Sequence, residues 1–443
     1  MNIKIRFLSL FVLLIMMLAC GPLALPTTTP IPPSPTPTHH PSLTPTQQPS
    51  PTPTQQPSPE LPALTGVAEL SMPTAEASPT PLTPLPAAPA HFRKGDPVQL
   101  DSLTMTGRTE GWGLSGPYVL TTADGGQTWR EVTPPESFTS ATKNQAYGAF
   151  LNAQTAWIIF AEDSQISPEA SVWSTTDGGR NWTPSAPLSH QVVGENVWAE
   201  FDVLDAQNVW MMVRGVYAGA GTHYNHELFR SADGGLTWTS LDGQISDNYT
   251  GMVFADAKFG LRTLETTGFY APGPPAYDVT IDGGANWEGR ELPPPPEAPD
   301  LFNQYPYCET FQPVLLSTLS IRMLVGCFDY YDPPKQFTSY FYSSQDGGAT
   351  WQTVHLPDKV QAAQDTLIYF GVNHALLLGH DTYLSTSDGQ TWSFVRTVYW
   401  DGQFSFIDSQ DGWAVARLNG QVALLKTSDG AATWTILKPA FTQ

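Results

Sequence analysis

Short runs of aliphatic and aromatic residues recur along most of the chain, with turn-forming residues between them. Alternation of apolar and polar positions within a run predicts a β-strand, because successive side chains of a strand point to opposite faces. The last unit contains four such runs, at residues 403–408, 412–418, 421–428 and 433–437. The first unit repeats them at residues 98–106, 111–115, 118–122 and 128–132. We therefore expect small antiparallel sheets of four strands each.

One short motif links the third and fourth runs of each unit. It has Ser or Thr two places before an Asp, a Gly after the Asp, and a Trp at its end. Asp-Gly favours a tight hairpin, because Gly accepts a positive φ and the carboxylate accepts hydrogen bonds from the turn amides. The Trp then buries a large apolar area. The seven copies are TADGGQTW (122–129), TTDGGRNW (175–182), SADGGLTW (231–238), TIDGGANW (280–287), SQDGGATW (344–351), TSDGQTW (386–392) and TSDGAATW (427–434).

These copies are spaced by about 41 to 64 residues, which is typical of propeller blades. One four-stranded sheet is too small to be stable alone and gains a core by packing on its neighbours. The sequence predicts an all-β fold, a seven-bladed β-propeller of four-stranded antiparallel blades over residues 91–443. The first and last units each contain four strands, so we expect them to meet directly; a strand exchange at the seam is the alternative.

The motif resembles the Asp-box, also called the BNR repeat, in all seven copies. In that family the box lies on the hairpin between the third and fourth strands of a blade, and its Asp and Trp are structural. Turn carboxylates are usually satisfied locally, which makes them poor candidates for chemistry. The resemblance implies structural roles for Asp124, Asp177, Asp233, Asp282, Asp346, Asp388, Asp429, Trp129, Trp182, Trp238, Trp287, Trp351, Trp392 and Trp434.

Among Asp-box families, the combination of GWAV-like second strands (412–415) with TSDGGATW-like hairpins is most similar to the photosystem II stability and assembly factor propellers and their relatives in non-photosynthetic bacteria. This resemblance implies a noncatalytic binding or assembly role. Those factors hold their client with an arginine patch. No arginines of this chain can be matched to that patch residue by residue.

The first 90 residues differ in composition from the rest. Two basic residues precede an apolar run over residues 7–18, which is short for a membrane span and is followed by Ala19 and Cys20. Residues 1–20 resemble a bacterial lipoprotein signal peptide with Cys20 lipidated; an ordinary secretory signal or an uncleaved anchor is the alternative. Residues 21–90 are rich in Pro, Thr, Ser and Gln and predict a disordered stalk. We expect an exported protein, lipid-anchored on the extracytoplasmic side of the membrane or secreted.

With Cys20 assigned to the anchor, two cysteines remain, Cys308 and Cys327. They lie just before the first strand of the fifth blade and at the end of its second strand. Two neighbouring cysteines in an exported chain predict a disulfide, with two free buried thiols as the alternative.

Charge narrows the range of partners. The chain has 41 acidic and 20 basic residues, a net charge of −21, and nearly all of them follow residue 90. Such a field opposes nucleic acids and anionic membrane surfaces. It also keeps an exported protein soluble. We expect no nucleic-acid partner, membrane contact only through the N-terminal lipid anchor, and a monomer.

Long aromatic loops gather on the face opposite the repeated turns. In an antiparallel four-stranded blade, the links between the second and third strands and between successive blades lie on that face. Three such links in neighbouring blades are residues 215–224, 267–275 and 329–336, and the connection 292–308 emerges beside them. Tyrosine offers apolar area and a hydroxyl together, which suits a protein or glycan ligand. The predicted surface comprises Tyr217, Tyr224, Phe269, Tyr270, Tyr305, Tyr307, Tyr330 and Tyr331; alternatively, these aromatics fasten the loops to the ring.

Signals for catalysis are weak. His223 and His226 lack a recognisable third ligand, so we expect no metal and no cofactor. Asp-box families include sialidases, but residues 91–97 (HFRKGDP) have the Phe and Arg of their FRIP motif without the Ile-Pro. Carboxylate pairs for glycoside hydrolysis cannot be selected without geometry. The sequence favours a noncatalytic extracytoplasmic binding or assembly propeller over an extracellular glycoside hydrolase or carbohydrate-binding protein.

Overall fold

The computed structural model describes residues 91–135, 144–162, 165–192, 196–217, 223–245, 249–264, 273–329 and 336–442. The predicted signal peptide, Cys20 and stalk lie outside these residues and stay predictions. Within the described ranges, no helix is both long and apolar enough to cross a membrane.

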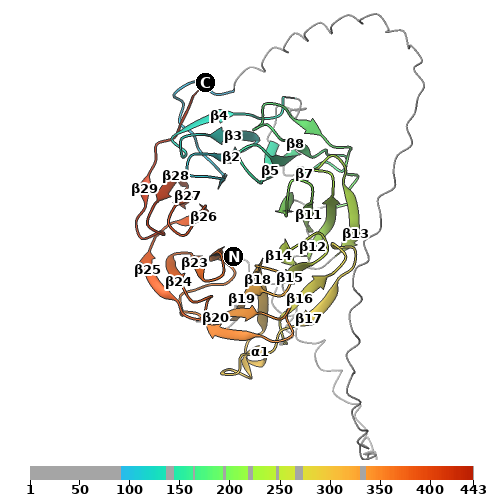
Figure 1. Ribbon diagram of the computed structural model, residues 1–443, viewed down its shortest axis with the longest axis vertical. Helices are drawn as coiled ribbons and strands as arrows, with labels where there is room; N and C mark the ends of the chain where they lie inside the picture. Colours follow the sequence, from blue (N-terminus) through green and yellow to red (C-terminus); the bar gives the residue numbers. More distant parts are fainter. Residues whose placement is uncertain are drawn as a thin grey trace, which may run out of the picture. The chain divides into compact units, whose positions relative to one another are not determined.

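Seven small sheets follow one another around a ring in chain order (Figure 1). Blade one comprises β1 (Ser102–Met105), β2 (Gly111–Ser115), β3 (Tyr118–Thr122) and β4 (Thr128–Glu131). Blade two comprises β5 (Asn144–Phe150), β6 (Ala156–Glu162), β8 (Trp173–Thr175) and β9 (Thr183–Pro184), with β7 (Gln165–Ile166) beside β6. Blade three comprises β10 (Val197–Val203), β11 (Val209–Tyr217), β12 (His223–Ser231) and β13 (Thr239–Ile245).

The remaining blades follow the same order of strands. Blade four comprises β14 (Tyr249–Phe254), β15 (Gly260–Leu264), β16 (Ala276–Thr280) and β17 (Glu288–Glu291). Blade five follows α1 (Leu301–Gln304) and comprises β18 (Tyr307–Leu315), β19 (Ile321–Asp329), β20 (Gln336–Ser344) and β21 (Gln352–His355). Blade six comprises β22 (Thr366–Phe370), β23 (His374–Leu378), β24 (Asp381–Ser385) and β25 (Ser393–Thr397). Blade seven comprises β26 (Asp401–Phe406), β27 (Gly412–Leu418), β28 (Gln421–Thr427) and β29 (Thr435–Ile436).

The predicted fold class is confirmed. Consecutive strands of each blade pair in antiparallel fashion, the first strand lies nearest the ring centre, and the fourth lies at the rim (Figure 1). The predicted strands 111–115, 118–122 and 412–418 coincide with β2, β3 and β27. The repeated turn therefore identifies the blades correctly.

The core lies between blades. One cluster of buried side chains joins Trp112 of blade one to Ile158 of blade two, and another joins Leu261 of blade four to Val325 of blade five. The middle strand β19 is buried along almost its whole length, because both of its faces contact neighbouring blades. Each blade thus depends on its neighbours for burial of its apolar side chains.

The first and last blades meet directly, as the sequence predicts. The backbone N–H of Leu103 on β1 donates to Gln403 Oε1 at 2.9 Å, and that of Met105 donates to Ser405 Oγ at 2.8 Å. Gln403 and Ser405 both lie on β26. The innermost strands of blades one and seven are therefore joined by side-chain hydrogen bonds.

The C-terminal tail adds a further element at this seam. Strand β30 (Ala440–Phe441) pairs in parallel with β4, so that blade one has a fifth strand at its rim. Phe441 N–H donates to Asp96 O at 2.9 Å, and the Phe92 ring stacks on Phe441 with centroids 3.9 Å apart. The sequence left a strand exchange at the seam open as an alternative but did not place a strand at residues 440–441.

The ring has two faces. We call the one that carries the repeated turns, residues 122–129 and their equivalents, the turn face. We call the opposite one, which carries the hairpins joining the second and third strands of the blades, the hairpin face. Residues 115–118 in blade one and 418–421 in blade seven are two of these hairpins.

Candidate functional site on the hairpin face

In the described residues, the hairpins of blades three and five form much longer ladders than the hairpin of blade six. Counted from the turn face, the β11–β12 ladder has nine residue pairs and the β19–β20 ladder has nine. The matching ladder of blade six has four pairs. At about 3.4 Å per strand residue, the two long ladders exceed that of blade six by about 17 Å. The two long hairpins lie on either side of blade four, whose own link between β15 and β16 is outside the described residues at 265–272.

The structure revises the predicted loops. Residues 215–217 and 223–224 continue β11 and β12 as strand instead of forming a loop, with Tyr217 opposite His223 and Val216 opposite Tyr224. Tyr305 and Tyr307 are half-buried and pack against two different core clusters. Four predicted residues of the surface lie outside the described residues: Phe269, Tyr270, Tyr330 and Tyr331.

The β11–β12 hairpin is braced on the side of blade four. Arg214 on β11 is nearly buried, and its Nη1 donates to Glu200 Oε1 at 3.0 Å. Its other terminal nitrogen donates to the backbone oxygen of Tyr249, the first residue of β14. His226, which pairs with Arg214 across the ladder, packs edge-on against the Tyr249 ring with centroids 4.4 Å apart. A buried polar contact thus fastens this hairpin to blade four.

The opposite side of the same hairpin is braced through Glu227. Its carboxylate is buried and accepts the Ser240 hydroxyl at 2.6 Å and the Gln191 N–H at 3.0 Å. Gln191 belongs to the connection that arrives from blade two. Sequence reasoning missed Arg214 and Glu227, although charged residues inside the apolar runs VWMMVRG and HELF were a usable signal.

The long hairpin of blade five is held by a covalent link. Cys308 on β18 and Cys327 on β19 lie opposite each other in the ladder and form a disulfide, with an S–S distance of 2.04 Å. Both residues are buried, in a cluster that also includes Leu301 and Phe302 of α1. Phe337, near the hairpin end of β20, remains 39% exposed. The sequence did not single out Phe337.

Blade six presents two carboxyl groups of different character on the hairpin face. Asp365, just before β22, is buried, and burial raises its pKa to about 6, with the nearby charge of Asp381 adding to the effect. Burial acts in the same direction on Asp381. Hydrogen bonds outweigh it there, because the Thr397 hydroxyl at 2.5 Å and Lys359 Nζ at 3.0 Å hold the Asp381 pKa below its usual range.

On the turn face, six of the seven predicted aspartates are satisfied inside their own turns. Asp233 illustrates them: it accepts the Ser231 hydroxyl at 2.9 Å, the Thr237 N–H at 2.9 Å and the Thr237 hydroxyl at 2.5 Å. In Asp346, the hydroxyl bond from Thr350 is the main cause that lowers the pKa to about 2. The same pattern of bonds occurs at Asp124, Asp177, Asp282 and Asp429. Trp129 is buried, and the other six turn tryptophans are half-buried.

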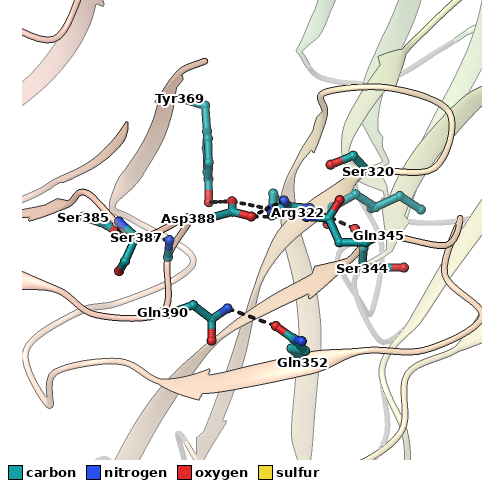
Figure 2. A network of polar contacts seen from close by, with 12 residues as sticks. Ser320, Arg322, Ser344, Gln345, Gln352, Tyr369, Ser385, Ser387, Asp388 and Gln390 are labelled. Atoms are coloured by element: carbon teal, nitrogen blue, oxygen red, sulfur yellow. Dashed lines mark hydrogen bonds and ion pairs between the residues drawn. The ribbon is translucent and has the colours of Figure 1, made fainter. Parts of the chain in front are cut away.

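The prediction that Asp388 is the bonding aspartate of its own turn is wrong. In blade six the bonds of the turn are made by Ser385, whose Oγ accepts the Gly389 N–H at 2.9 Å, and by Ser387, whose Oγ accepts the Thr391 N–H at 2.9 Å. Ser387 therefore takes the aspartate position, and Asp388 takes the place of the first glycine, with φ 55°. Its carboxylate turns instead to Arg322 of blade five (Figure 2).

The described residues contain no group of three or more His, Cys, Asp or Glu side chains placed to hold a metal ion. His226 is buried against Tyr249, and the side chain of His223 lies outside the described part of the chain. The site built by the described residues is thus a pair of braced hairpins with aromatic and acidic side chains around them.

No known family model matches the chain. A xyloglucanase from Paenibacillus sp is 25% identical over 170 residues, which cover 34% of this chain and 16% of that enzyme. The structure of YCF48 bound to D1 peptide is 16% identical, with a TM-score of 0.49, and the match covers 78% of this chain and 99% of that one. The GH74 xyloglucanase of Xanthomonas campestris is 11% identical, with a TM-score of 0.32 and coverage of 76% and 64%. These relatives comprise a peptide-bound protein and two xyloglucanases, so they do not decide the function of this chain.

Proposed function

We propose that this chain is a noncatalytic binding or assembly module that holds a protein or glycan on the hairpin face of blades three to five. The observation that carries the proposal is the pair of nine-pair hairpins on either side of blade four. Both hairpins are fixed at their bases, by Arg214 and Glu227 in blade three and by the disulfide in blade five. Such fixation reduces the ordering cost of binding.

The chemistry around the hairpins suits a neutral or cationic ligand with apolar groups. Phe337 is partly exposed, and Tyr305 and Tyr307 are half-buried, so each offers part of a ring to a ligand. The net charge of −21 attracts cationic partners and repels anionic ones. Protein segments and sugars both meet these requirements.

The proposal includes export and a lipid anchor at Cys20, which the lipoprotein-like signal supports. Replacing Cys20 by Ala should abolish incorporation of a labelled fatty acid and release the protein from washed membranes. Retention of both in the variant would remove the anchor from the proposal without affecting the binding surface.

Pruning the hairpins tests the binding surface. Residues 216–224 are replaced by Asn-Gly, the two-residue turn that blade seven uses at Asn419–Gly420, and residues 329–336 are replaced in the same way. These changes keep the Arg214–His226 pair and the disulfide, so the blades should stay folded. We expect a partner crosslinked to the intact protein in its native envelope to be lost from the pruned protein.

A matched control changes the turn face instead. Leu236 and Ile281 are 49% and 76% exposed there, and replacing both by Ser should leave capture of the partner unchanged. Unchanged melting of both variants by circular dichroism shows that the ring is intact. Capture that survives pruning but is lost in the control would place the binding surface on the turn face and end the proposal.

Glycoside hydrolysis is the second candidate, and the opposed pKa shifts of Asp365 and Asp381 favour it. A carboxylic acid with a raised pKa near an ionised carboxylate is the arrangement that glycosidases use. If Asp365 and Asp381 form a catalytic pair, the protein should hydrolyse fluorogenic glycosides, and Asp365→Asn should abolish this hydrolysis. If the protein hydrolyses no glycoside of a broad panel, the enzymatic candidate is excluded and the noncatalytic binding function remains.

A further inference from the structure

Three junctions between blades share one contact on the turn face. A tryptophan near the start of the second strand donates its indole N–H to the first glycine of the next blade's turn. The distances are 2.8 Å from Trp157 to Gly234 O, 2.9 Å from Trp210 to Gly283 O, and 2.9 Å from Trp413 to Gly125 O. At the junction of blades three and four, Phe254 also stacks on Trp210 with centroids 3.8 Å apart. Tryptophan and the first glycine thus form a contact shared by three junctions, and phenylalanine joins it at the junction of blades three and four.

The junction between blades five and six has three different residues at these same positions. Arg322 occupies the position in its blade that corresponds to Trp210. Each of them follows the second-strand residue that pairs with the first Ser of the turn. Tyr369 occupies the position that corresponds to Phe254. Each of these two first-strand residues pairs with the second-strand residue that, on its other side, pairs with the first Ser or Thr of the turn. Asp388 occupies the position of the first glycine.

The three exchanged residues contact one another (Figure 2). Arg322 Nε lies 2.8 Å from Asp388 Oδ1, and Nη2 lies 2.5 Å from Asp388 Oδ2, which makes a bidentate ion pair. The Arg322 side chain is 0% exposed, and Nη1 donates to the backbone oxygens of Ile321 and Ser344 at 2.8 and 2.9 Å. The Tyr369 hydroxyl donates to Asp388 Oδ1 at 3.4 Å.

Two features of this unit are unfavourable in isolation. A buried arginine needs a partner for its charge, and an aspartate at φ 55° occupies a backbone region that favours glycine. At the corresponding position the other six turns have Gly125, Gly178, Gly234, Gly283, Gly347 and Gly430. Only the turn of blade six therefore has a carboxylate at this position, because the aspartates of the other turns lie one residue earlier and accept bonds within their own turns, as Asp233 does.

We propose that Arg322, Tyr369 and Asp388 form a charged key that allows blade five to pack only against blade six. Seven similar blades present similar edges, so an incorrect pairing during folding is a hazard. Packing of Arg322 against any of the other turns would leave its charge buried without a carboxylate, which excludes those pairings. The key thus specifies the order of the blades.

Replacing the three residues by those found at the junction of blades three and four tests the proposal. Asp388→Gly relieves the positive φ but leaves Arg322 without its partner, and we expect the melting midpoint to fall by roughly 5–10 °C. Arg322→Trp together with Tyr369→Phe and Asp388→Gly should recover most of that loss. The triple variant should nevertheless refold from denaturant with a lower yield of monomer, because blade five then fits other turns.

Arg108 pairs with Asp411 at the junction of blades seven and one but is 70% exposed, so Arg108→Gln should shift the midpoint by less than about 2 °C. If Asp388→Gly does not fold, the milder Asp388→Asn replaces it in the comparison. A triple variant no more stable than Asp388→Gly would overturn the proposal. A triple variant that recovers stability and refolds as well as the wild type would overturn the ordering role.

Discussion

On the turn face, blades three and four are almost the same: Asp233 and Asp282 each accept three hydrogen bonds from the same positions of their own turns. On the hairpin face the blades differ, with nine ladder pairs in blade three and five in blade one, although the turn of blade one has the same bonds at Asp124. Identical local bonds on one face build a regular scaffold. Different hairpin lengths on the other give each blade a distinct surface, as binding requires.

The largest expected effect comes from breaking the common unit of the turn face. Trp210 is fully buried, stacks on Phe254 and bonds to Gly283 O, so Trp210→Ala removes packing and a bond between two blades. We expect a loss of about 4 kcal/mol in the free energy of unfolding. Urea unfolding followed by tryptophan fluorescence measures it. A loss below about 1 kcal/mol would show that the turn face does not hold the ring together.

Reducing the disulfide should act on the hairpin face. Cys308→Ser with Cys327→Ser should cost about 3 kcal/mol, because the bridge closes a loop with a sequence separation of 19 residues. Amide exchange should accelerate at the hairpin end of β18 and β19 and remain slow at the turn end. Alkylation and mass spectrometry with and without reductant first establish that the bond forms. Uniform acceleration around the ring would contradict the separation of the two faces.

Two aspartates, Asp365 on the hairpin face and Asp346 on the turn face, should make the stability depend on pH in opposite directions. Asp365 has a folded pKa of about 6, above its unfolded value, so the stability it contributes is present below about pH 4 and is lost as pH rises to 6. Asp346 has a folded pKa of about 2, so its contribution is present above about pH 4 and is lost as pH falls to 2. Asp365→Asn should reduce the loss in the free energy of unfolding between pH 4 and 6 by about 1–3 kcal/mol. Asp202 is half-buried, and burial raises its pKa to about 6, so it contributes to the same change and Asp202→Asn is the matched comparison. No difference between Asp365→Asn and the wild type from pH 4 to 6 would contradict this assignment.

The repeated turn could be predicted because its bonds are local. The residues that satisfy Asp233 lie within four positions of it, and the same holds for five further copies. In blade six the sequence allows two alignments of the turn, one with Thr386 and Asp388 and one with Ser385 and Ser387 in the two bonding positions. The bonds of Ser385 and Ser387 select the second alignment, and Asp388 pairs instead with Arg322, which lies 66 positions away.

The hairpin face could be predicted only in outline. The position of the long links followed from the strand order, but their extent as strands did not. Residues 215–224 are rich in Gly and Ala, and their pairing depends on contacts of Arg214 with Tyr249 and of Glu227 with Gln191, distant in the sequence. The two-residue strand β30 was too short to give a periodic signal.

We propose that a partner binds the hairpin face of blades three to five. Site-specific photocrosslinking is the sharpest test of this binding surface. A photoreactive phenylalanine analogue replaces Phe337 on the hairpin face in one protein and Ile281 on the turn face in another, and both are irradiated in the native cell envelope. The account predicts a discrete crosslinked adduct from position 337 and none from position 281. An adduct from position 281 alone would contradict it.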